Sequence, residues 1–258
     1  MKLLALDVGN TNIVPGVFVE GSLVGSWRLS TDRERTADEY GAILTLLLGQ
    51  AGIAPADIAG VALCSVVPPL QRTLDALLGR YFPVRALAVD HRTDTGIRIS
   101  YDPPGDVGAD RIVNAAAAYH RYGGPCIVVD LGTATTFDVV AADGEFVGGA
   151  IAPGVGTSLQ GLLARAPRLP RVELERPARA IGHTTRESMQ SGIVLGAAGQ
   201  VDAMVSLMRA ELGSDARVIA TGGLAGVIAP HAQSIQEVCP ALTLQGLEMI
   251  WRRVAGTP

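Results

Sequence analysis

Residues 3–12 read LLALDVGNTN, and residues 126–136 read CIVVDLGTATT. Each stretch is a short apolar run that ends in aspartate and enters an Asp-x-Gly turn, as a buried strand does when it leaves a sheet. Each is followed by a hairpin and then by a helix. The two aspartates, Asp7 and Asp130, are 123 residues apart, about half the chain. This repetition predicts an internal duplication of a β-β-β-α-β-α unit.

The rest of the sequence can be divided between two such halves, residues 1–122 and residues 123–258. Hairpin turns are expected at Glu20-Gly21 and Asp143-Gly144. Capping boxes are expected where Thr36 is followed by Glu39 and where Thr184 is followed by Glu187. Further strands are expected at residues 58–67, 84–89 and 217–221, and helices at residues 70–80, 109–122, after Pro153 and at the end of the chain.

The composition excludes several classes of protein. The chain has 258 residues, a net charge of −4 and 48% hydrophobic residues, which is too apolar for a disordered chain. Lys2 is the only lysine, so the GxxxxGK[ST] phosphate loop is absent. An acidic pI of about 5.6 argues against nucleic-acid binding, and no apolar run reaches the length of a membrane span. Without a CxxC pair or a targeting signal, we expect a cytoplasmic protein.

The turn at residues 7–12 suits the binding of phosphate. A chain that turns sharply after a strand leaves several backbone N–H groups pointing the same way, and these groups bind anionic oxygens. Gly9 lets a phosphate approach the backbone closely, and Asn10, Thr11 and Asn12 add neutral donors. Asp7 would be repelled by phosphate, so we expect it to hold Mg²⁺ through water.

The second half offers the same arrangement at Asp130-Leu131-Gly132-Thr133. Two such turns from a duplicated unit are typical of the actin and hexokinase type of ATPase fold, in which two ribonuclease H-like halves enclose a nucleotide cleft. Thr221-Gly222-Gly223 fits the turn that supports adenosine in that fold, although it could also be a simple tight turn.

A third motif, Gly108-Ala109-Asp110-Arg111, stands at the start of a helix. Its charged pair could simply compensate the helix dipole. Alternatively, Asp110 could accept the proton of a substrate hydroxyl while Arg111 binds an acceptor carboxylate. Phosphoryl transfer needs such a base together with positioning and charge neutralisation.

In this order the motifs resemble those of type III pantothenate kinases: DVGNTN at residue 7, GADR at 108, DLGTATT at 130, GGAIAPG at 148–154, SGIVLG at 191–196 and TGG at 221. The resemblance covers essentially the whole chain. It implies ATP-dependent phosphorylation of pantothenate, the first step of coenzyme A biosynthesis, by a cytoplasmic homodimer that binds neither nucleic acid nor membrane.

The resemblance also implies roles for individual residues. ATP with Mg²⁺ would be bound by Asp7, Val8, Gly9, Asn10, Thr11, Asn12, Ile13, Val14 and Thr133. Pantothenate would be bound by Tyr101, Gly108, Ala109, Asp110, Arg111 and Thr185. Asp110 would be the proton acceptor, and Asp130 would hold a monovalent cation, K⁺ or NH₄⁺.

The sequence leaves open the exact function of the chain and the structure of three of its segments. Another small-molecule kinase or phosphohydrolase of the same fold, or a regulatory protein of that fold, would share many of these motifs. Pro15 interrupts a predicted strand and requires an edge or a bulge there. The Arg- and Pro-rich residues 165–180 could form a connecting loop or a basic lid. The apolar stripe at 201–208 could belong to the core or to a subunit interface.

Overall fold

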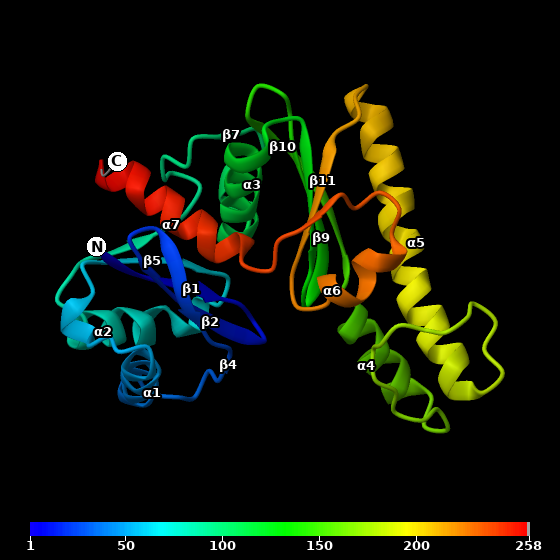
Figure 1. Cartoon of the computed structure of the whole chain (residues 1–258), viewed down its shortest axis with the longest axis horizontal. Helices are drawn as coiled ribbons and strands as arrows, with labels where there is room; N and C mark the ends of the chain where they lie inside the picture. The colour runs from blue at the N-terminus through cyan, green and yellow to red at the C-terminus, as the bar shows by residue number, and fades with distance from the viewer. Residues whose placement is uncertain (257–258) are drawn as a thin grey trace. The chain divides into compact units, whose positions relative to one another are not determined.

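A computed structural model describes residues 1–256 of the chain. The chain forms two compact α/β units, both visible in Figure 1. Unit 1 contains residues 1–97, residues 101–117 and the chain from Leu242 onward, and unit 2 contains residues 98–100 and 118–241. These bounds differ from the division after residue 122 expected from the sequence. The bounds differ because the last helix of the chain packs on the first sheet rather than on the second, and so belongs to unit 1.

Unit 1 is built on a six-stranded mixed sheet. Its strands are β1 (Lys2–Val8), β2 (Asn12–Val19), β3 (Ser22–Ser26), β4 (Leu29–Ser30), β5 (Gly60–Ser65) and β6 (Ala86–Ala88). The sheet order is β3-β2-β1-β5-β6, with β4 paired to β2. The first three strands are antiparallel, whereas β5 and β6 run parallel to β1. The carboxyl ends of β1, β5 and β6 therefore meet at one edge of the sheet.

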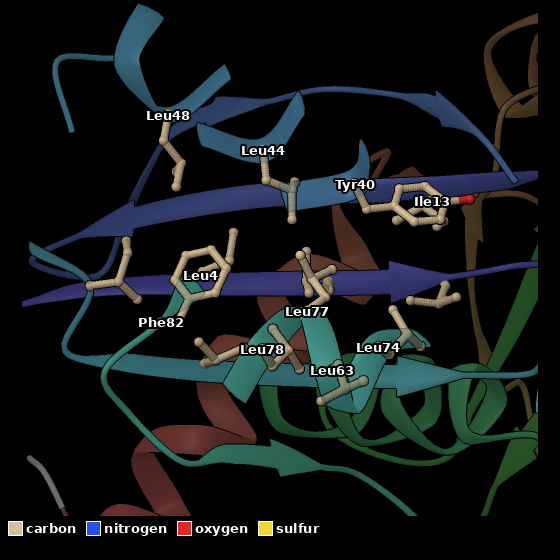
Figure 2. Packing of buried hydrophobic residues seen from close by; sticks show 14 of the residues in the cluster. Leu4, Ile13, Tyr40, Leu44, Leu48, Leu63, Leu74, Leu77, Leu78 and Phe82 are labelled. Carbon is tan, nitrogen blue, oxygen red and sulfur yellow. The ribbon is translucent and has the colours of Figure 1, made fainter. Parts of the chain in front are cut away.

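The helices of unit 1 cover both faces of this sheet. They are α1 (Ala37–Gln50), α2 (Gln71–Tyr81), the first part of α3 (Ala109–Tyr122) and α7 (Leu242–Ala255), with short 3₁₀ turns η1 (Pro55–Asp57), η2 (Pro68–Leu70) and η3 (Pro104–Asp106). In Figure 2, Leu44 and Leu48 of α1 and Leu77 of α2 point toward the strands. Since side chains alternate along β1, Leu4 joins this cluster, whereas Leu3 packs with α3 and α7 on the other face.

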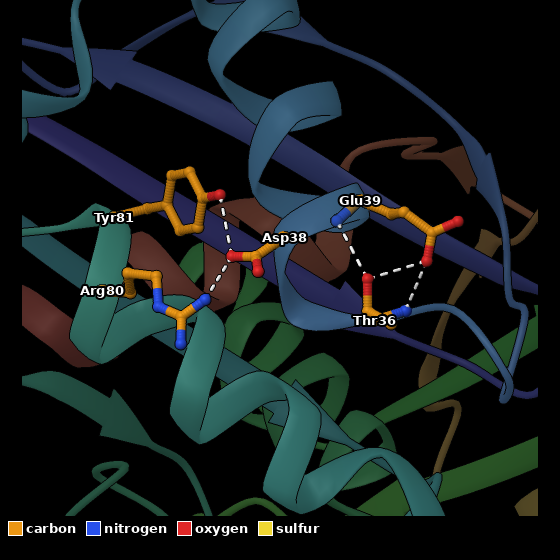
Figure 3. A network of polar contacts seen from close by, with 5 residues as sticks. All are labelled: Thr36, Asp38, Glu39, Arg80 and Tyr81. Carbon is orange, nitrogen blue, oxygen red and sulfur yellow. Dashed lines mark hydrogen bonds and ion pairs between the residues drawn. The ribbon is translucent and has the colours of Figure 1, made fainter.

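The capping box at the start of α1 is confirmed. Thr36 Oγ1 accepts a hydrogen bond from the Glu39 amide at 3.3 Å, and Glu39 Oε2 accepts one from the Thr36 amide at 2.7 Å (Figure 3). Beside it, Asp38 accepts hydrogen bonds from Arg80 and from the Tyr81 hydroxyl at the end of α2. These contacts join the two helices that cover one face of the sheet, although such an exposed ion pair adds little to stability.

Unit 2 repeats the sheet of unit 1. Its strands are β7 (Arg98–Ile99), β8 (Cys126–Leu131), β9 (Ala134–Val140), β10 (Glu145–Pro153), β11 (Arg217–Thr221) and β12 (Glu237–Val238). The order β10-β9-β8-β11-β12 matches β3-β2-β1-β5-β6 strand for strand, and β7 adds to the edge at β10. The pairings have the same directions as in unit 1. The predicted α/β fold with duplicated ribonuclease H-like halves is confirmed.

The remaining helices belong to unit 2. They are α4 (Val155–Arg165), α5 (Thr185–Leu212), α6 (Ala225–Ile228) and the 3₁₀ turn η4 (Ala229–His231). Val201 and Val205 of α5 are buried in the core of this unit, and Met204 and Met208 pack against it. The apolar stripe of this helix therefore contributes to the core.

By length and composition alone, α5 could cross a membrane, and it is the one helix within residues 1–256 that could. The sequence predicts no such segment, because Gly and polar residues interrupt every apolar run, although the average over the helix is apolar. Core helices pass the same test. Asp202, in the middle of α5, accepts hydrogen bonds from Ser234 and from the Gln233 amide, as expected for a helix packed within a folded unit.

Three local expectations are refined by the structure. Thr184 caps α5, but Glu187 binds the His183 amide rather than the Thr184 amide, so the capping box is only half formed. Residues 165–180 form a loop, and its Val172 is buried against α4 and α5, so this segment is anchored rather than a free lid.

Pro15 lies in β2, an interior strand, where the sequence suggests an edge or a bulge. The Pro15 carbonyl accepts a hydrogen bond at 3.0 Å from the amide of Trp27, which lies in the short segment between β3 and β4. Pro15 is therefore opposite a gap in the neighbouring strand. In an extended strand the nitrogen and the carbonyl of one residue point the same way. The proline therefore removes no donor from a continuous ladder.

Candidate functional site

The carboxyl edge of the unit 1 sheet brings several predicted site residues together. Asp7 near the end of β1 is paired in parallel register with Cys64 near the end of β5. The Cys64 thiol donates a hydrogen bond to Asp7 Oδ1 at a sulfur–oxygen distance of 3.6 Å. Burial first, then the charges of Asp7 and Asp110, raise the pKa of this thiol. Both carboxylates therefore lie close to the same sulfur atom.

The predicted phosphate turn after β1 is held in shape by the chain that follows β4. The Gly9 amide donates to the Asn12 carbonyl at 2.9 Å, which closes the turn. Thr31 contacts the turn twice: its hydroxyl donates to the Gly9 carbonyl at 2.6 Å, and its amide donates to the Thr11 carbonyl at 3.0 Å. Asn10 and Thr11 are exposed at the tip of the turn. The turn is thus rigidly built, yet its tip is open to a ligand.

An arginine lies beside this turn. Arg33 Nη2 donates to Asn10 Oδ1 at 3.2 Å, and the side chain is exposed. Within the described chain, Arg33 forms no ion pair with a carboxylate, although Asp32 and Glu34 flank it in sequence. The turn therefore has a positive charge at its rim.

Three of the residues predicted to bind nucleotide have side chains that lie in or against the hydrophobic clusters of unit 1. Val8 is fully buried and Ile13 is nearly so, and both belong to the hydrophobic cluster under α1 and α2. Val14 is partly buried against the cluster on the opposite face. These three residues can contribute to binding only through their main chain or by supporting the turn.

The Gly108–Arg111 motif lies at the start of α3, as predicted. Asp110 Oδ1 accepts a hydrogen bond from the Arg111 amide at 2.8 Å. A Cβ atom on Gly108 would lie 2.6 Å from the same carboxylate oxygen, so the absence of a side chain there lets the carboxylate fold back over the helix start. The Asp110 amide also forms a hydrogen bond with its own carboxylate. The carboxylate therefore caps the start of α3, and this position is compatible with a further role as proton acceptor.

The electrostatics of Asp110 suit a proton acceptor. Burial raises the pKa of its carboxyl group, and the Arg111 amide and guanidinium oppose that rise only in part. A carboxylate with a raised pKa holds a transferred proton better than an ordinary aspartate does. Arg111 itself is buried, at 7% exposure, and its predicted role toward an acceptor carboxylate remains a prediction.

A cavity of about 450 Å³ opens in unit 1 beside the start of α3. Its wall combines apolar side chains with a few polar groups, a usual make-up for a small-molecule site. Asp90, one of these groups, is paired with Arg92 at 2.6 Å. The cavity is lined by Leu63, Ser65, Val66, Pro68, Gln71, Ala88, Val89, Asp90, His91, Gly105, Asp106, Val107, Gly108 and Ala109. It therefore reaches the Gly108–Arg111 motif from the carboxyl ends of β5 and β6.

In unit 2, the second Asp-x-Gly turn packs on the Thr-Gly-Gly turn. Asp130 at the end of β8 is paired in parallel register with Thr221 at the end of β11, and the Leu224 amide donates to the Leu131 carbonyl at 3.2 Å. Gly222 has φ +92°, and a Cβ atom there would overlap Asp130 Oδ1 and lie 2.7 Å from the Leu131 backbone. Gly222 is thus required by both conformation and space, and it fixes the place of the Asp130 carboxylate.

Thr133, which is predicted to bind ATP, lies at the exposed tip of the same turn. Its carbonyl accepts hydrogen bonds from the Gly154 amide at 3.2 Å and from the Thr157 hydroxyl at 2.7 Å. These contacts anchor the turn to the start of α4 and leave the Thr133 side chain exposed.

The other residues predicted to bind pantothenate fall in different units. Tyr101 belongs to unit 1 and is partly buried, and it follows the short strand β7. Thr185 is the first residue of α5 in unit 2 and is exposed, whereas its neighbour Thr184 is occupied as the cap. Within each unit the structure groups Asp7 with Asp110, and Asp130 with Gly222.

The donor set fits the predicted ions. Among residues 1–256 there is no group of three or more His, Cys, Asp or Glu side chains that could enclose a metal. Mg²⁺ in phosphoryl-transfer sites is commonly held by one or two carboxylates together with substrate phosphates and water. Asp7, partly exposed beside the phosphate turn, matches that pattern. Asp130 offers a carboxylate that lies against Gly222, and its role toward a monovalent cation remains a prediction.

Three residues of the site were missed by sequence reasoning. Cys64 looked like an ordinary strand residue, and only the register of β5 against β1 places it on Asp7. Thr31 and Arg33 lie more than 20 residues beyond the turn that they contact. The extended run WRLST before α1 gives no local signal for these contacts, which depend on the pairing of β4 with β2.

Comparison with known sequences identifies the family. A family model described as type III pantothenate kinase matches residues 3–207. The chain is 50% identical over 251 residues to the type III pantothenate kinase of Moorella thermoacetica, covering 97% of this chain and 99% of that protein. It is 48% identical over 251 residues to the type III pantothenate kinase of Myxococcus xanthus, covering 97% and 98%.

Solved structures agree on the fold at low sequence identity. MreB 5 of Spiroplasma citri, bound to AMPPNP, superposes with a TM-score of 0.61 at 9% identity and covers 99% of this chain and 97% of that one. A ROK family glucokinase from Streptomyces griseus gives 0.52 at 13% identity, covering 97% and 98%. These likenesses bear on the fold alone. From the match of the family model and the identity to its members over nearly the full length, the chain belongs to the type III pantothenate kinase family.

Proposed function

We propose that this chain transfers the γ-phosphoryl group of ATP to the primary hydroxyl of pantothenate, forming 4′-phosphopantothenate in the first step of coenzyme A biosynthesis. Membership of the family supports the overall reaction. The observation that carries the mechanism is the buried Asp110 carboxylate, which the Arg111 amide holds at the start of α3 and whose pKa is raised by burial.

On this proposal Asp110 acts as the general base. Asp110 Oδ2 accepts the hydroxyl proton of pantothenate as the hydroxyl oxygen bonds to the γ-phosphorus and the bond from that phosphorus to the bridging oxygen of ADP breaks. The hydrogen bond from the Arg111 amide keeps the carboxylate oriented during the transfer. Burial raises the pKa of Asp110, which favours acceptance of the proton by its carboxylate.

Each unit contributes residues proposed to bind ATP. In unit 1, the turn at residues 9–12 supplies backbone amides and the side chains of Asn10 and Thr11. In unit 2, the proposed ATP-binding residue is Thr133. Arg33 adds a positive charge at the rim of the first turn. The side chains of Val8, Ile13 and Val14 support the turn from within the core.

Asp7 is the residue proposed to hold Mg²⁺ through water. When bound, this ion neutralises charge on the ATP phosphates. Asp7 is fixed for that task by its place at the end of β1 and by the Cys64 thiol, which donates a hydrogen bond to Oδ1.

The cavity beside α3 is the proposed site of the acceptor. Its apolar wall, which includes Leu63, Val66 and Val107, suits the methyl groups of pantothenate, and its rim at Gly108 and Ala109 adjoins the base. Tyr101, Arg111 and Thr185 are the further residues that the family resemblance assigns to pantothenate. The acidic side chains of Asp90 and Asp106 in the wall make it unsuited to the carboxylate end, which we assign to Arg111.

Three further features belong to the proposal. Asp130, which lies against Gly222, holds K⁺ or NH₄⁺. The working protein is a homodimer, and it acts in the cytoplasm. These features follow the pattern of the family that the sequence resembles.

The test measures ADP formation by the purified protein with ATP, Mg²⁺ and K⁺. We expect ADP to appear only when pantothenate is added, together with a phosphorylated product of matching amount. Glucose and acetate serve as controls for other kinases of this fold. Equal turnover with either control, or none with pantothenate, contradicts the proposed function.

A further inference from the structure

The thiol of Cys64 has an unusual position for a core cysteine. The side chain is 1% exposed and belongs to the cluster between the sheet of unit 1 and the helices α3 and α7. Its neighbours in this cluster are apolar, including Leu3, Ala5 and Leu247. An alanine or a valine could fill this apolar position equally well. Packing therefore does not explain why the sulfur lies next to polar groups of Asp7, Val8 and Asp110.

Those polar atoms belong to the residues that the proposed reaction uses. The Cys64 Sγ–H donates to Asp7 Oδ1 at 3.6 Å, within the usual range for a sulfur donor, and the Val8 backbone forms a hydrogen bond to the sulfur. The Asp110 carboxylate also lies close enough for its charge to act on the thiol. Cys64 thus contacts the carboxylate that is proposed to hold Mg²⁺, on the same side of the sheet as the base.

Cys126 provides a comparison within the same chain. It is also a fully buried cysteine in a strand, at the start of β8. Burial alone raises the pKa of the Cys126 thiol, to about 12, and this thiol forms no hydrogen bond to any of residues 1–256. A buried cysteine in this fold can therefore serve packing only. The hydrogen bond to Asp7 is specific to Cys64.

We propose that Cys64 is a positioning residue whose S–H hydrogen bond holds the Asp7 carboxylate in the orientation that binds the magnesium ion of MgATP. This inference rests on the proposed role of Asp7. A carboxylate on a strand end can rotate about its terminal bond, and a donor fixed by the neighbouring strand removes that freedom. Groups that orient metal ligands in this way commonly alter metal affinity 10- to 100-fold when they are removed.

The experiment compares nucleotide binding by three variants with the parent protein. Cys64→Val removes the donor at similar volume, Cys64→Ser retains a hydroxyl donor, and Cys126→Val is the control for a buried cysteine without a hydrogen bond. ATP is titrated calorimetrically in the presence of excess Mg²⁺ and again with EDTA, without pantothenate. Melting temperatures are recorded for each protein, and Cys64→Ala replaces the valine variant if the latter does not fold.

We expect Cys64→Val to weaken the binding of MgATP about 10-fold while leaving the binding of metal-free ATP within about 2-fold of the parent. Cys64→Ser should restore MgATP binding to within about 3-fold, and Cys126→Val should bind as the parent does. A purely structural role would lower the melting temperature without separating the two titrations.

Equal effects on MgATP and on metal-free ATP, or parent-like MgATP binding by Cys64→Val, would overturn the inference. Because the titrations contain no acceptor, their outcome is independent of the identity of that substrate. A parent protein that binds MgATP but does not phosphorylate pantothenate contradicts the proposed function and leaves the role of Cys64 supported by the binding data.

Discussion

Replacing Gly222 by alanine tests whether the two turns of unit 2 are built as one structure. Gly222 has φ +92°, and the added Cβ atom would lie 2.7 Å from both the nitrogen and the carbonyl carbon of Leu131 and would overlap Asp130 Oδ1. The first two contacts are with backbone, which cannot move aside without shifting the end of β8. The carboxylate is a side chain and could rotate away, so the backbone contacts set the cost.

Two contributions set the size of the effect. A non-glycine residue in the left-handed region costs about 1–2 kcal/mol. Overpacking against a fixed backbone costs about 1–3 kcal/mol more. The sum, about 2–5 kcal/mol, is a substantial part of the stability of a typical domain. For a protein of this size it corresponds to a fall of about 4–20 °C in melting temperature.

Thermal and urea unfolding of the purified variant measure this loss. Gly226→Ala is the matched control, because Gly226 lies nearby in α6 and a Cβ atom there meets nothing within 4 Å. We expect that control to melt at or slightly above the parent temperature, since alanine favours a helix over glycine by about 0.5–1 kcal/mol. If Gly222→Ala melts within about 1 °C of the parent, the contact between the two turns does not constrain this position as described.

Three other predictions concern the charged groups of the site. Burial raises the pKa of Asp110, so the folded protein holds the Asp110 proton more tightly than the unfolded chain does. This group therefore favours the folded state below the usual aspartate pKa of about 3.9, and that advantage is lost as the pH rises through the raised pKa. Asp110→Asn should therefore melt above the parent at pH 7 but not at about pH 4, and a constant difference in melting temperature would refute this sign. Arg33→Ala should raise the KM for ATP about 3- to 30-fold with unchanged KM for pantothenate, whereas Arg72→Ala, an exposed arginine on α2, should leave both unchanged. Asp130→Ala should abolish the activation of the enzyme by K⁺, and a parent-like rise in rate with K⁺ would contradict the assignment.

Local sequence patterns predict most of the fold because the elements of this chain carry strong local signals. The apolar runs that end at Asp7 and Asp130 form β1 and β8, and the hairpin turns at Glu20-Gly21 and Asp143-Gly144 adopt the expected conformations, with positive φ at Glu20, Gly21 and Gly144. The capping box at Thr36 is complete. Duplication then follows, since two copies of one strand and turn pattern produce two sheets of the same order.

Contacts between distant segments could not be predicted in the same way. The amphipathic pattern of α7 predicts a helix but not the sheet that it covers, and it packs on unit 1 through Leu244, Leu247 and Ile250. Glu187 has the spacing of a capping box, yet a neighbouring amide, that of His183, takes its carboxylate. Cys64 acquires its contact with Asp7 only from the register of parallel strands 57 residues apart.

The most direct test of the account compares Asp110→Asn with the parent in pantothenate-dependent ADP formation, with ATP binding measured on the same preparations. Asparagine keeps an oxygen for the Arg111 amide but cannot accept the proton. The account predicts that kcat falls about 10²–10⁴-fold while the affinity for ATP stays within about 3-fold of the parent. A rate within about 3-fold of the parent would contradict it, because the base would then lie elsewhere.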